Sequence, residues 1–305
     1  MAQSLTQERE VVAEGGLERD ASQSRRRRRW YVYLQRDKKA LFGLIMLTLL
    51  IGGAIFAPLI TPYDPNAQEF DFLEPPSLKH PMGTDDLGRD LFTRIIYGAR
   101  ISLLVGITTV TLALLIGVPM GLLAGFHGGW IDNLIMRYID LQWAFPNFII
   151  AVYLVAVFGT GLSNVIVAVT LAFLDDFARI TRSMALTIRE QEFVMAARAI
   201  GVSNIRMLGR HVLPNAAAPI IVLATITVSY AILAEAGLSF LGLGVKPSTP
   251  TWGLILSDAR SFFSRAWWLA IFPGLAIMLT VLSINFLGDM LRDALDVRDY
   301  QEERR

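Results

Sequence analysis

The sequence contains no cysteine, and this absence removes several kinds of chemistry at once. Disulfide frameworks, thiolate metal sites and cysteine nucleophiles all require that residue. Histidine is also scarce: His80, His127 and His211 are far apart and lack the HxxxH or HExxH spacing of a zinc site. We therefore predict no metal site and no catalytic residue in this chain.

Charge is the second thing the sequence has little of. Charged residues make up 18% of the 305 residues, and acids and bases nearly cancel to a net charge of +1. The basic residues are clustered and form no stripe, so nucleic acid is not a predicted partner. Apolar residues, in contrast, reach 53%, with a mean hydropathy of +0.47. That content predicts a membrane protein in contact with lipid.

Transmembrane helices each need about 20 mostly apolar residues to cross the bilayer. Six stretches meet this need: residues 40–60, 101–125, 138–158, 164–182, 216–240 and 269–290. The fourth is the weakest, because it contains Asp175, Asp176 and Arg179. Asp175 and Arg179 lie on one helical face, so we interpret them as a self-neutralising pair and not as part of a catalytic dyad.

The predicted fold class is all-α: a polytopic membrane protein with six transmembrane helices and both termini in the cytoplasm. Orientation follows from the Lys and Arg residues that crowd residues 25–39 and the loops expected on the same side. The long polar stretch before the first apolar run predicts a retained span and no cleaved signal peptide. The predicted parts are a disordered basic cytoplasmic tail (1–35), the first transmembrane helix (36–62), an extracytoplasmic segment (63–100), a membrane core (101–290) containing a cytoplasmic loop (183–215), and a cytoplasmic C-terminal tail (291–305).

One charged, amphipathic segment, EFVMAARAIGVSNIRMLGRHVLPN (192–215), lies among these apolar helices. Apolar or small residues recur at steps of three and four and predict one helical face: Phe193, Ala196, Ala197 and Ile200. Gly201 suits the end of this helix, and Ser203 is expected to cap a second helix that runs toward Pro214.

The small alanines of this face would let another surface approach closely, with Glu192 and Arg198 available for pairing at its rim. An amphipathic helix that rests on the membrane, or packs on its own bundle, is the alternative interpretation. Periodicity alone leaves both open.

The pattern AA-x3-G followed by LP, at Ala196, Ala197, Gly201 and Leu213-Pro214, resembles the cytoplasmic loop motif of ABC importer permeases. Met195 and His211 depart from the general consensus of that motif. Three more stretches resemble the C-type membrane subunit of the dipeptide/oligopeptide branch: HPMGTDDLGRDLFTRIIYGARISLLVG (80–106), AEAGLSFLGLGVKPSTPTWG (234–253) and NFLGDMLRDALDVR (285–298). The resemblance covers about residues 36–298.

The resemblance implies the type I permease fold of ABC importers and a place in the plasma (inner) membrane of a bacterium or archaeon. It also implies that the first helix of the loop is a coupling helix that docks in a groove of an ATP-binding subunit. The residues that would make this contact are Glu192, Phe193, Ala196, Ala197, Arg198 and Gly201.

The implied partners are a second, related permease chain, two cytoplasmic ATPase subunits, an extracytoplasmic peptide-binding protein and membrane lipid. The sequence has no GxxxxGK[ST] loop to cradle phosphates. ATP and Mg would therefore be bound by the ATPase subunits, and this chain is predicted to hold no cofactor and not to be an enzyme.

The predicted cargo is a peptide, with a nickel chelate, glutathione or an oligosaccharide as open alternatives. Glu235 is the candidate for the translocation pathway, since a lone acid in an apolar helix must face a partner, a cavity or a ligand. A structural hydrogen bond between spans is the competing interpretation. An ion-coupled secondary transporter is a rival function, but its broken helices and inverted repeats are not evident in the sequence.

Overall fold

A computed structural model describes residues 37–295, and within that range the chain forms helices and one isolated β-bridge between Thr84 and Asp90. The all-α prediction is confirmed for this part of the chain. The predicted disordered tail and residues 296–305 of the predicted C-terminal tail lie outside the described residues.

Four helices are long and apolar enough to cross a membrane: α2 (Lys38–Ile55), α4 (Leu91–His127), the continuous helix Asn204–Phe240 and α12 (Trp268–Leu295). A bent pair, α5 (Gly129–Trp143) and α6 (Asn147–Phe158), adds a fifth if it forms one span. The remaining long helix, α7 (Leu162–Arg189), has 28 residues but carries several charges. The count of six spans stays a prediction.

The span predicted at residues 138–158 is not straight, because α5 and α6 meet at an angle of 91°. Helix α5 ends at Trp143, and α6 begins after Pro146. Proline has no N–H to donate and disfavours helical geometry in the residue before it, which accounts for the break. The prediction of one continuous span at this place is wrong in that respect.

The second helix of the 192–215 segment does not end near Pro214 as predicted. It begins as α9 (Asn204–Met207), passes through a π-helical turn, η1 (Leu208–Val212), and continues as α10 (Leu213–Phe240). Ser203 precedes α9 but makes no side-chain capping bond. Pro214 has no N–H to donate, and the wider π turn before it accommodates the missing hydrogen bond. The helix of the loop therefore continues into the membrane span.

The predicted extracytoplasmic segment (63–100) is helical at its end. Helix α4 begins at Leu91, before the span predicted at residues 101–125, and runs unbroken to His127. Asp90 caps it by accepting a hydrogen bond from the Thr93 N–H at 2.8 Å. Before it, α3 (Ala57–Ile60) and an irregular segment form the connection from α2.

The centre of the bundle is the packing of α4 on α7, which is the most extensive contact between helices in the described chain. Three glycines at every fourth position of α4 face α7: Gly117, Gly121 and Gly125. A Cβ on Gly121 would lie 2.8 Å from the Cβ of Thr181, and one on Gly125 would lie 2.8 Å from that of Ala185. Only glycine permits this approach of the two backbones.

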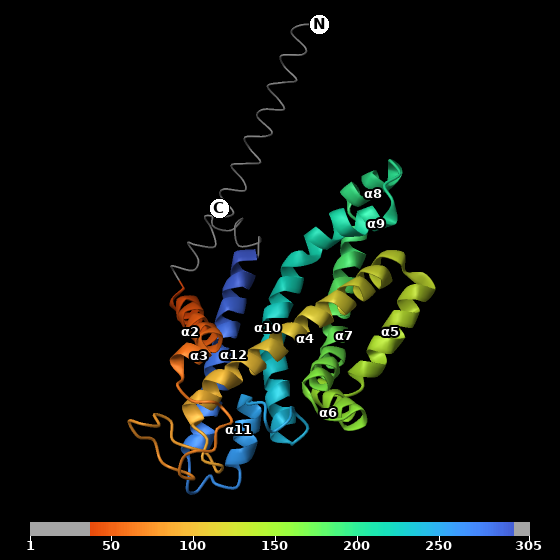
Figure 1. Ribbon diagram of the computed structural model, residues 1–305. Coiled ribbons are helices and arrows are strands. Elements are labelled where there is room, and N and C mark those ends of the chain that lie inside the picture. The colour runs from red at the N-terminus through yellow and green to blue at the C-terminus, as the bar shows by residue number, and fades with distance from the viewer. Residues whose placement is uncertain (1–36, 296–305) are drawn as a thin grey trace, which may run out of the picture.

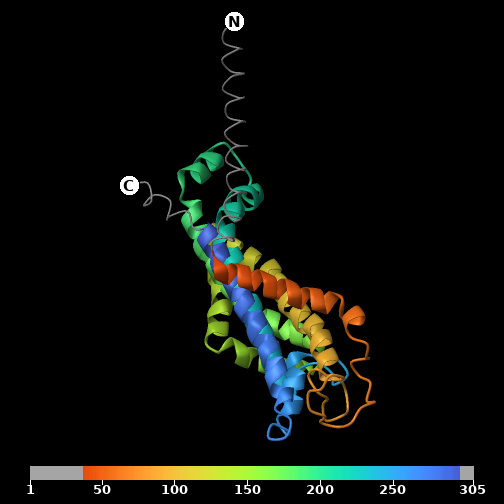
Figure 2. The same cartoon turned by 90° about the vertical axis from the view of Figure 1, so that its left-hand side faces the viewer.

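The two ends of the bundle differ in character (Figure 1). Helices α8 (Glu192–Ala199) and α9 stand at one end, and the irregular segment before α4 lies at the other end with α11 (Trp252–Ala259). The start of α2 and the end of α12 lie toward the α8 end, and Figure 2 shows α12 running along most of the bundle. The first and last described helices therefore have their outer ends toward the side of α8, and the side of the membrane on which the termini lie stays a prediction.

Gly121→Val should destabilise the protein, because the added side chain meets the α7 backbone and Thr181. Overpacking of this kind costs about 1–3 kcal/mol. Gly52→Ala is the matched control, since a Cβ there meets nothing within 4 Å. Thermal unfolding of the purified protein in detergent measures both, and an unchanged melting temperature for Gly121→Val would contradict the close contact.

Candidate functional site

Helix α8 and the turn after it form the candidate coupling site. The helix begins after Gln191, and the chain turns at Gly201 with a φ of +82°. The Val202 N–H donates to the Ala197 carbonyl at 3.1 Å, which closes the end of the helix. The predicted helix end at Gly201 is therefore confirmed, and the left-handed φ explains why glycine is there.

The face of α8 that packs against its own chain differs from the apolar face that periodicity predicts. Val194 and Ala197 are buried, with 0% and 8% of their surface exposed. Phe193, Met195 and Ile200 are exposed by 41%, 55% and 82%. Ala197 is thus a packing residue inside this chain, and the apolar surface open to another protein is made by the larger side chains.

Arginines attach this end of the bundle to α4 and α5. The Arg198 guanidinium lies 5.2 Å from the centre of the Phe126 ring, at the end of α4. Arg189 donates to the Gly125 carbonyl at 2.9 Å, and Arg182 makes two bonds to Asp132 at 2.5 and 2.7 Å. Arg198 therefore contacts an aromatic ring of its own chain but stays exposed, as do Glu192 and Ala196.

Glu235 lies inside the chain, between α10 and α4. It is fully buried and accepts hydrogen bonds from Ser102 at 3.2 Å and from Ser239 at 2.8 Å. The sequence singled out the acid but not its serine partners. One of them, Ser102, is 133 residues away, and no sequence pattern indicates that contact.

The predicted pair of Asp175 and Arg179 does not form. Arg179 donates to Asp140 of α5 at 3.1 Å, and its guanidinium lies 3.9 Å from the centre of the Trp143 ring. Within the described residues, both oxygens of the buried Asp175 lack a hydrogen-bond partner. The four-residue spacing is compatible with an ion pair between Asp175 and Arg179. Arg179 instead contacts an acid and an aromatic ring of α5.

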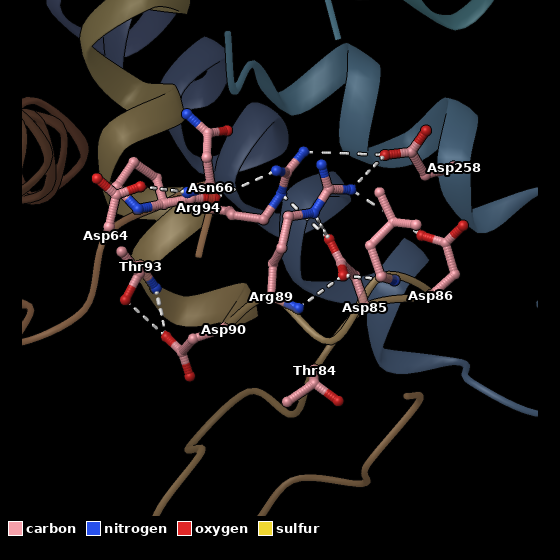
Figure 3. A network of polar contacts seen from close by, with 12 residues as sticks. Asp64, Asn66, Thr84, Asp85, Asp86, Arg89, Asp90, Thr93, Arg94 and Asp258 are labelled. Atoms are coloured by element: carbon pink, nitrogen blue, oxygen red, sulfur yellow. Dashed lines mark hydrogen bonds and ion pairs between the residues drawn. The ribbon is translucent and has the colours of Figure 1, made fainter. Parts of the chain in front are cut away.

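At the opposite end, a network of charged groups ties the irregular outer segment to α4 and α11 (Figure 3). Asp85 accepts from the Arg89 Nε at 2.6 Å and from two backbone N–H groups at 2.9 Å. Arg94 lies 3.4 Å from Asp85, and both arginines reach Asp258 of α11, at 3.5 and 3.8 Å. The sequence analysis did not predict this network, and its member Asp258 is 169 residues from Arg89 in the chain.

Two acids of this network, Asp86 and Asp258, have surroundings that disfavour their charged forms. Burial raises the pKa of Asp86, the neighbouring Asp85 raises it further, and Arg89 opposes the change. Burial also raises the pKa of Asp258, against the effect of Arg94. Asp85, in contrast, has the donors described above, so two adjacent acids have opposite surroundings.

Comparison with known proteins identifies the family. Residues 117–298 match the family of binding-protein-dependent transport system inner membrane components, and residues 24–76 match the N-terminal transmembrane domain of oligopeptide transport permease C. The chain belongs to this permease family. It is a multi-pass inner-membrane component of a bacterial ABC transporter, as predicted.

Two relatives match this permease along most of its length. A dipeptide transport system permease of Alkalihalophilus pseudofirmus is 48% identical over 86% of this chain and 87% of its own. A di/tripeptide transport system permease of Pseudomonas aeruginosa is 46% identical over 85% and 88%. A chain of the inward-facing MetNI methionine ABC transporter, 20% identical, has the same fold, with a TM-score of 0.57 over 68% of this chain and 98% of that one.

Asp85→Asn and Asp86→Asn should affect the stability of this permease in opposite directions. Loss of the Asp85 charge leaves Arg89 and Arg94 buried without their closest acid, at a cost of about 3–5 kcal/mol. Asp86→Asn removes a charge whose pKa is raised by burial, so the melting temperature should rise slightly at neutral pH.

The gain from Asp86→Asn has a defined pH dependence. A raised pKa means that the charged form costs stability above the folded pKa, and that this cost disappears as the pH falls toward the ordinary carboxyl value of about 4. The two proteins should therefore converge in acid. Thermal unfolding between neutral and acidic pH tests this, and a variant that melts lower than the wild type at neutral pH would contradict it.

Proposed function

We propose that this chain is the C-type permease subunit of an ATP-driven importer of peptides. The observation that carries this proposal is the likeness, along nearly the whole chain, to permeases named for dipeptide and di/tripeptide transport. The chain would form half of the translocation pathway and change its conformation when the ATPase subunits close.

The candidate coupling contact is the exposed side of α8. Phe193, Met195 and Ile200 offer apolar side chains to a groove of an ATPase subunit, with Glu192 and Ala196 beside them. Arg198 is exposed beside them and also contacts Phe126 of its own chain, whereas Ala197 is buried and would support the contact from beneath. Gly201 sets the direction in which the chain leaves the helix.

The proposed partners follow from this role. Two ATPase subunits would bind ATP and Mg on the side of α8, a second permease would complete the passage, and an extracytoplasmic binding protein would deliver the peptide. The surroundings of Glu235 support a structural role for this residue more than its predicted role in the translocation pathway. Its bonds to Ser102 and Ser239 favour a carboxylate that fixes α10 against α4.

Reconstitution tests the transport function directly. Proteoliposomes that contain this chain, a second permease, the ATPase subunits and the binding protein should take up labelled di- and tripeptides only when ATP is supplied on the side of α8. Uptake of other cargo but of no peptide would overturn the proposed substrate class. Transport without ATP would overturn the ABC mechanism.

Variants of α8 test the coupling contact. Phe193→Ser and Ile200→Ser should reduce copurification of the ATPase subunits, because they remove exposed apolar area without disturbing the buried side of α8. Gly201→Val should also uncouple transport, since its φ of +82° strains a β-branched residue although the space around it is open.

Gly209→Ala is the matched control for the glycine variant. Gly209 also has open space around it but lacks a left-handed φ, so uptake and ATP hydrolysis should stay at wild-type levels. Wild-type coupling in Phe193→Ser, Ile200→Ser and Gly201→Val together would exclude α8 as the coupling element.

A further inference from the structure

A recess of about 360 Å³ lies where α6, α7 and α10 meet. Its apolar wall is made of three aromatic and two aliphatic residues: Phe148, Phe173, Tyr230, Leu233 and Ala234. Asp176 enters from α7 and Asn147 from the start of α6, and the Asn147 side chain approaches the Asp176 carboxylate. An acidic group thus lies in an otherwise apolar hollow near the middle of α7.

Asp176 forms no ion pair in the part of the chain that the structure describes, since no Lys, Arg or His nitrogen lies within 4.0 Å of its carboxylate, although Arg179 of the same helix lies near it. The nearby Arg179 is engaged by Asp140 and by the Trp143 ring. The next residue, Asp175, is fully buried with both oxygens unpartnered. The middle of α7 therefore carries more negative than positive charge.

This imbalance limits what can lie against the recess. A carboxylate that faced lipid tails would be costly, so intramembrane acids lie against a partner or a water-filled passage. A carboxylate beside an amide oxygen accepts several hydrogen bonds, and the aromatic faces of Phe148, Phe173 and Tyr230 attract cations. A small cation that donates several hydrogen bonds matches all of these groups.

We propose that this recess binds a primary ammonium group of the cargo, with Asp176 as the residue that accepts it. The proposal rests on the proposed function, because a peptide carries such a group at its amino terminus or on a lysine side chain. Asn147 and the three aromatic side chains complete the site. Asp175 acts as a positioning charge behind it and does not touch the ammonium group.

The competing occupant is a lysine or arginine of the second permease. That contact would also neutralise Asp176, but it would be present with or without cargo. The two occupants therefore predict different effects on the assembly of the complex when the charge of Asp176 is removed. Loss of a permanent ion pair weakens the complex, whereas loss of a cargo site leaves the complex intact.

The first experiment uses Asp176→Asn in the full reconstituted complex. This change keeps the shape and removes the charge, so peptide uptake should fall about tenfold, as expected for loss of a charge-assisted hydrogen bond. Subunit copurification and ATP hydrolysis stimulated by the binding protein should remain at wild-type levels. Glu69→Gln is the matched control, because it removes an equal charge from an exposed position outside the recess, and uptake should stay within about twofold of wild type.

The second experiment uses the absence of cysteine from this chain. In Leu233→Cys, which places a thiol in the wall of the recess and keeps Asp176, an ammonium-bearing thiosulfonate should modify the thiol faster than a sulfonate-bearing one when the partner subunits are free of cysteine. Saturating lysyl dipeptide should slow that reaction. An amino-terminally free dipeptide without lysine, compared with its acetylated form, then distinguishes the terminal ammonium group from the side chain.

Several results would overturn the proposal. Dissociation of the second permease in Asp176→Asn would assign the carboxylate to a contact between subunits. No reaction of the introduced thiol in Leu233→Cys, with or without nucleotide, would show that the recess does not face the passage. Reaction without any protection by peptide would exclude the ammonium site. Failure of the proposed function is distinguishable, since the wild-type complex would then take up no peptide while the thiol of Leu233→Cys still reported whether the recess is open.

Discussion

The rest of the structure depends on the close contact between α4 and α7, which three glycines of α4 make possible. Helices that pack within a membrane gain little from the hydrophobic effect and depend on the fit of their surfaces. Backbone-to-backbone packing along Gly117, Gly121 and Gly125 provides that fit, and it fixes the relative position of the two helix ends. Arg189 then bonds the Gly125 carbonyl, and Arg198 stacks on Phe126 one residue further along. The location of α8 is therefore a consequence of this packing.

The acids inside the bundle differ in whether this chain supplies their hydrogen-bond partners. Glu235 is buried among hydroxyl donors of α4 and α10, so its cost is offset within this chain. Asp175 and Asp176 are not satisfied to that degree by the residues the structure describes. A buried acid with partners stabilises a contact, whereas an acid without them marks a place where the chain is incomplete alone. That difference explains why Glu235, the acid most conspicuous in the sequence, is the less informative one in the structure.

Much of this could be predicted from the sequence, and the failures have physical causes. The apolar runs, the position of α8 and the turn at Gly201 followed from local patterns. Periodicity identified an apolar face on α8 but not which of its residues its own chain would cover, so the burial of Ala197 was not predicted. Pro146 carried a usable signal for the break between α5 and α6. The contacts of Ser102 with Glu235 and of Arg94 with Asp258 join distant parts of the chain, and no local pattern specifies them.

Helix α7 connects the two candidate sites of the molecule. Its middle carries Asp176, and its end at Arg189 leads into α8 within three residues. At 1.5 Å per residue the two points are about 20 Å apart along one unbroken helix. A helix packed against α4 along several turns bends little, so displacement of α8 by an ATPase subunit would carry the Asp176 region with it. Because α6 and α10 form the other walls of the recess, the same displacement would alter its width. A single rigid element would thus connect the proposed coupling helix mechanically with the proposed site around Asp176.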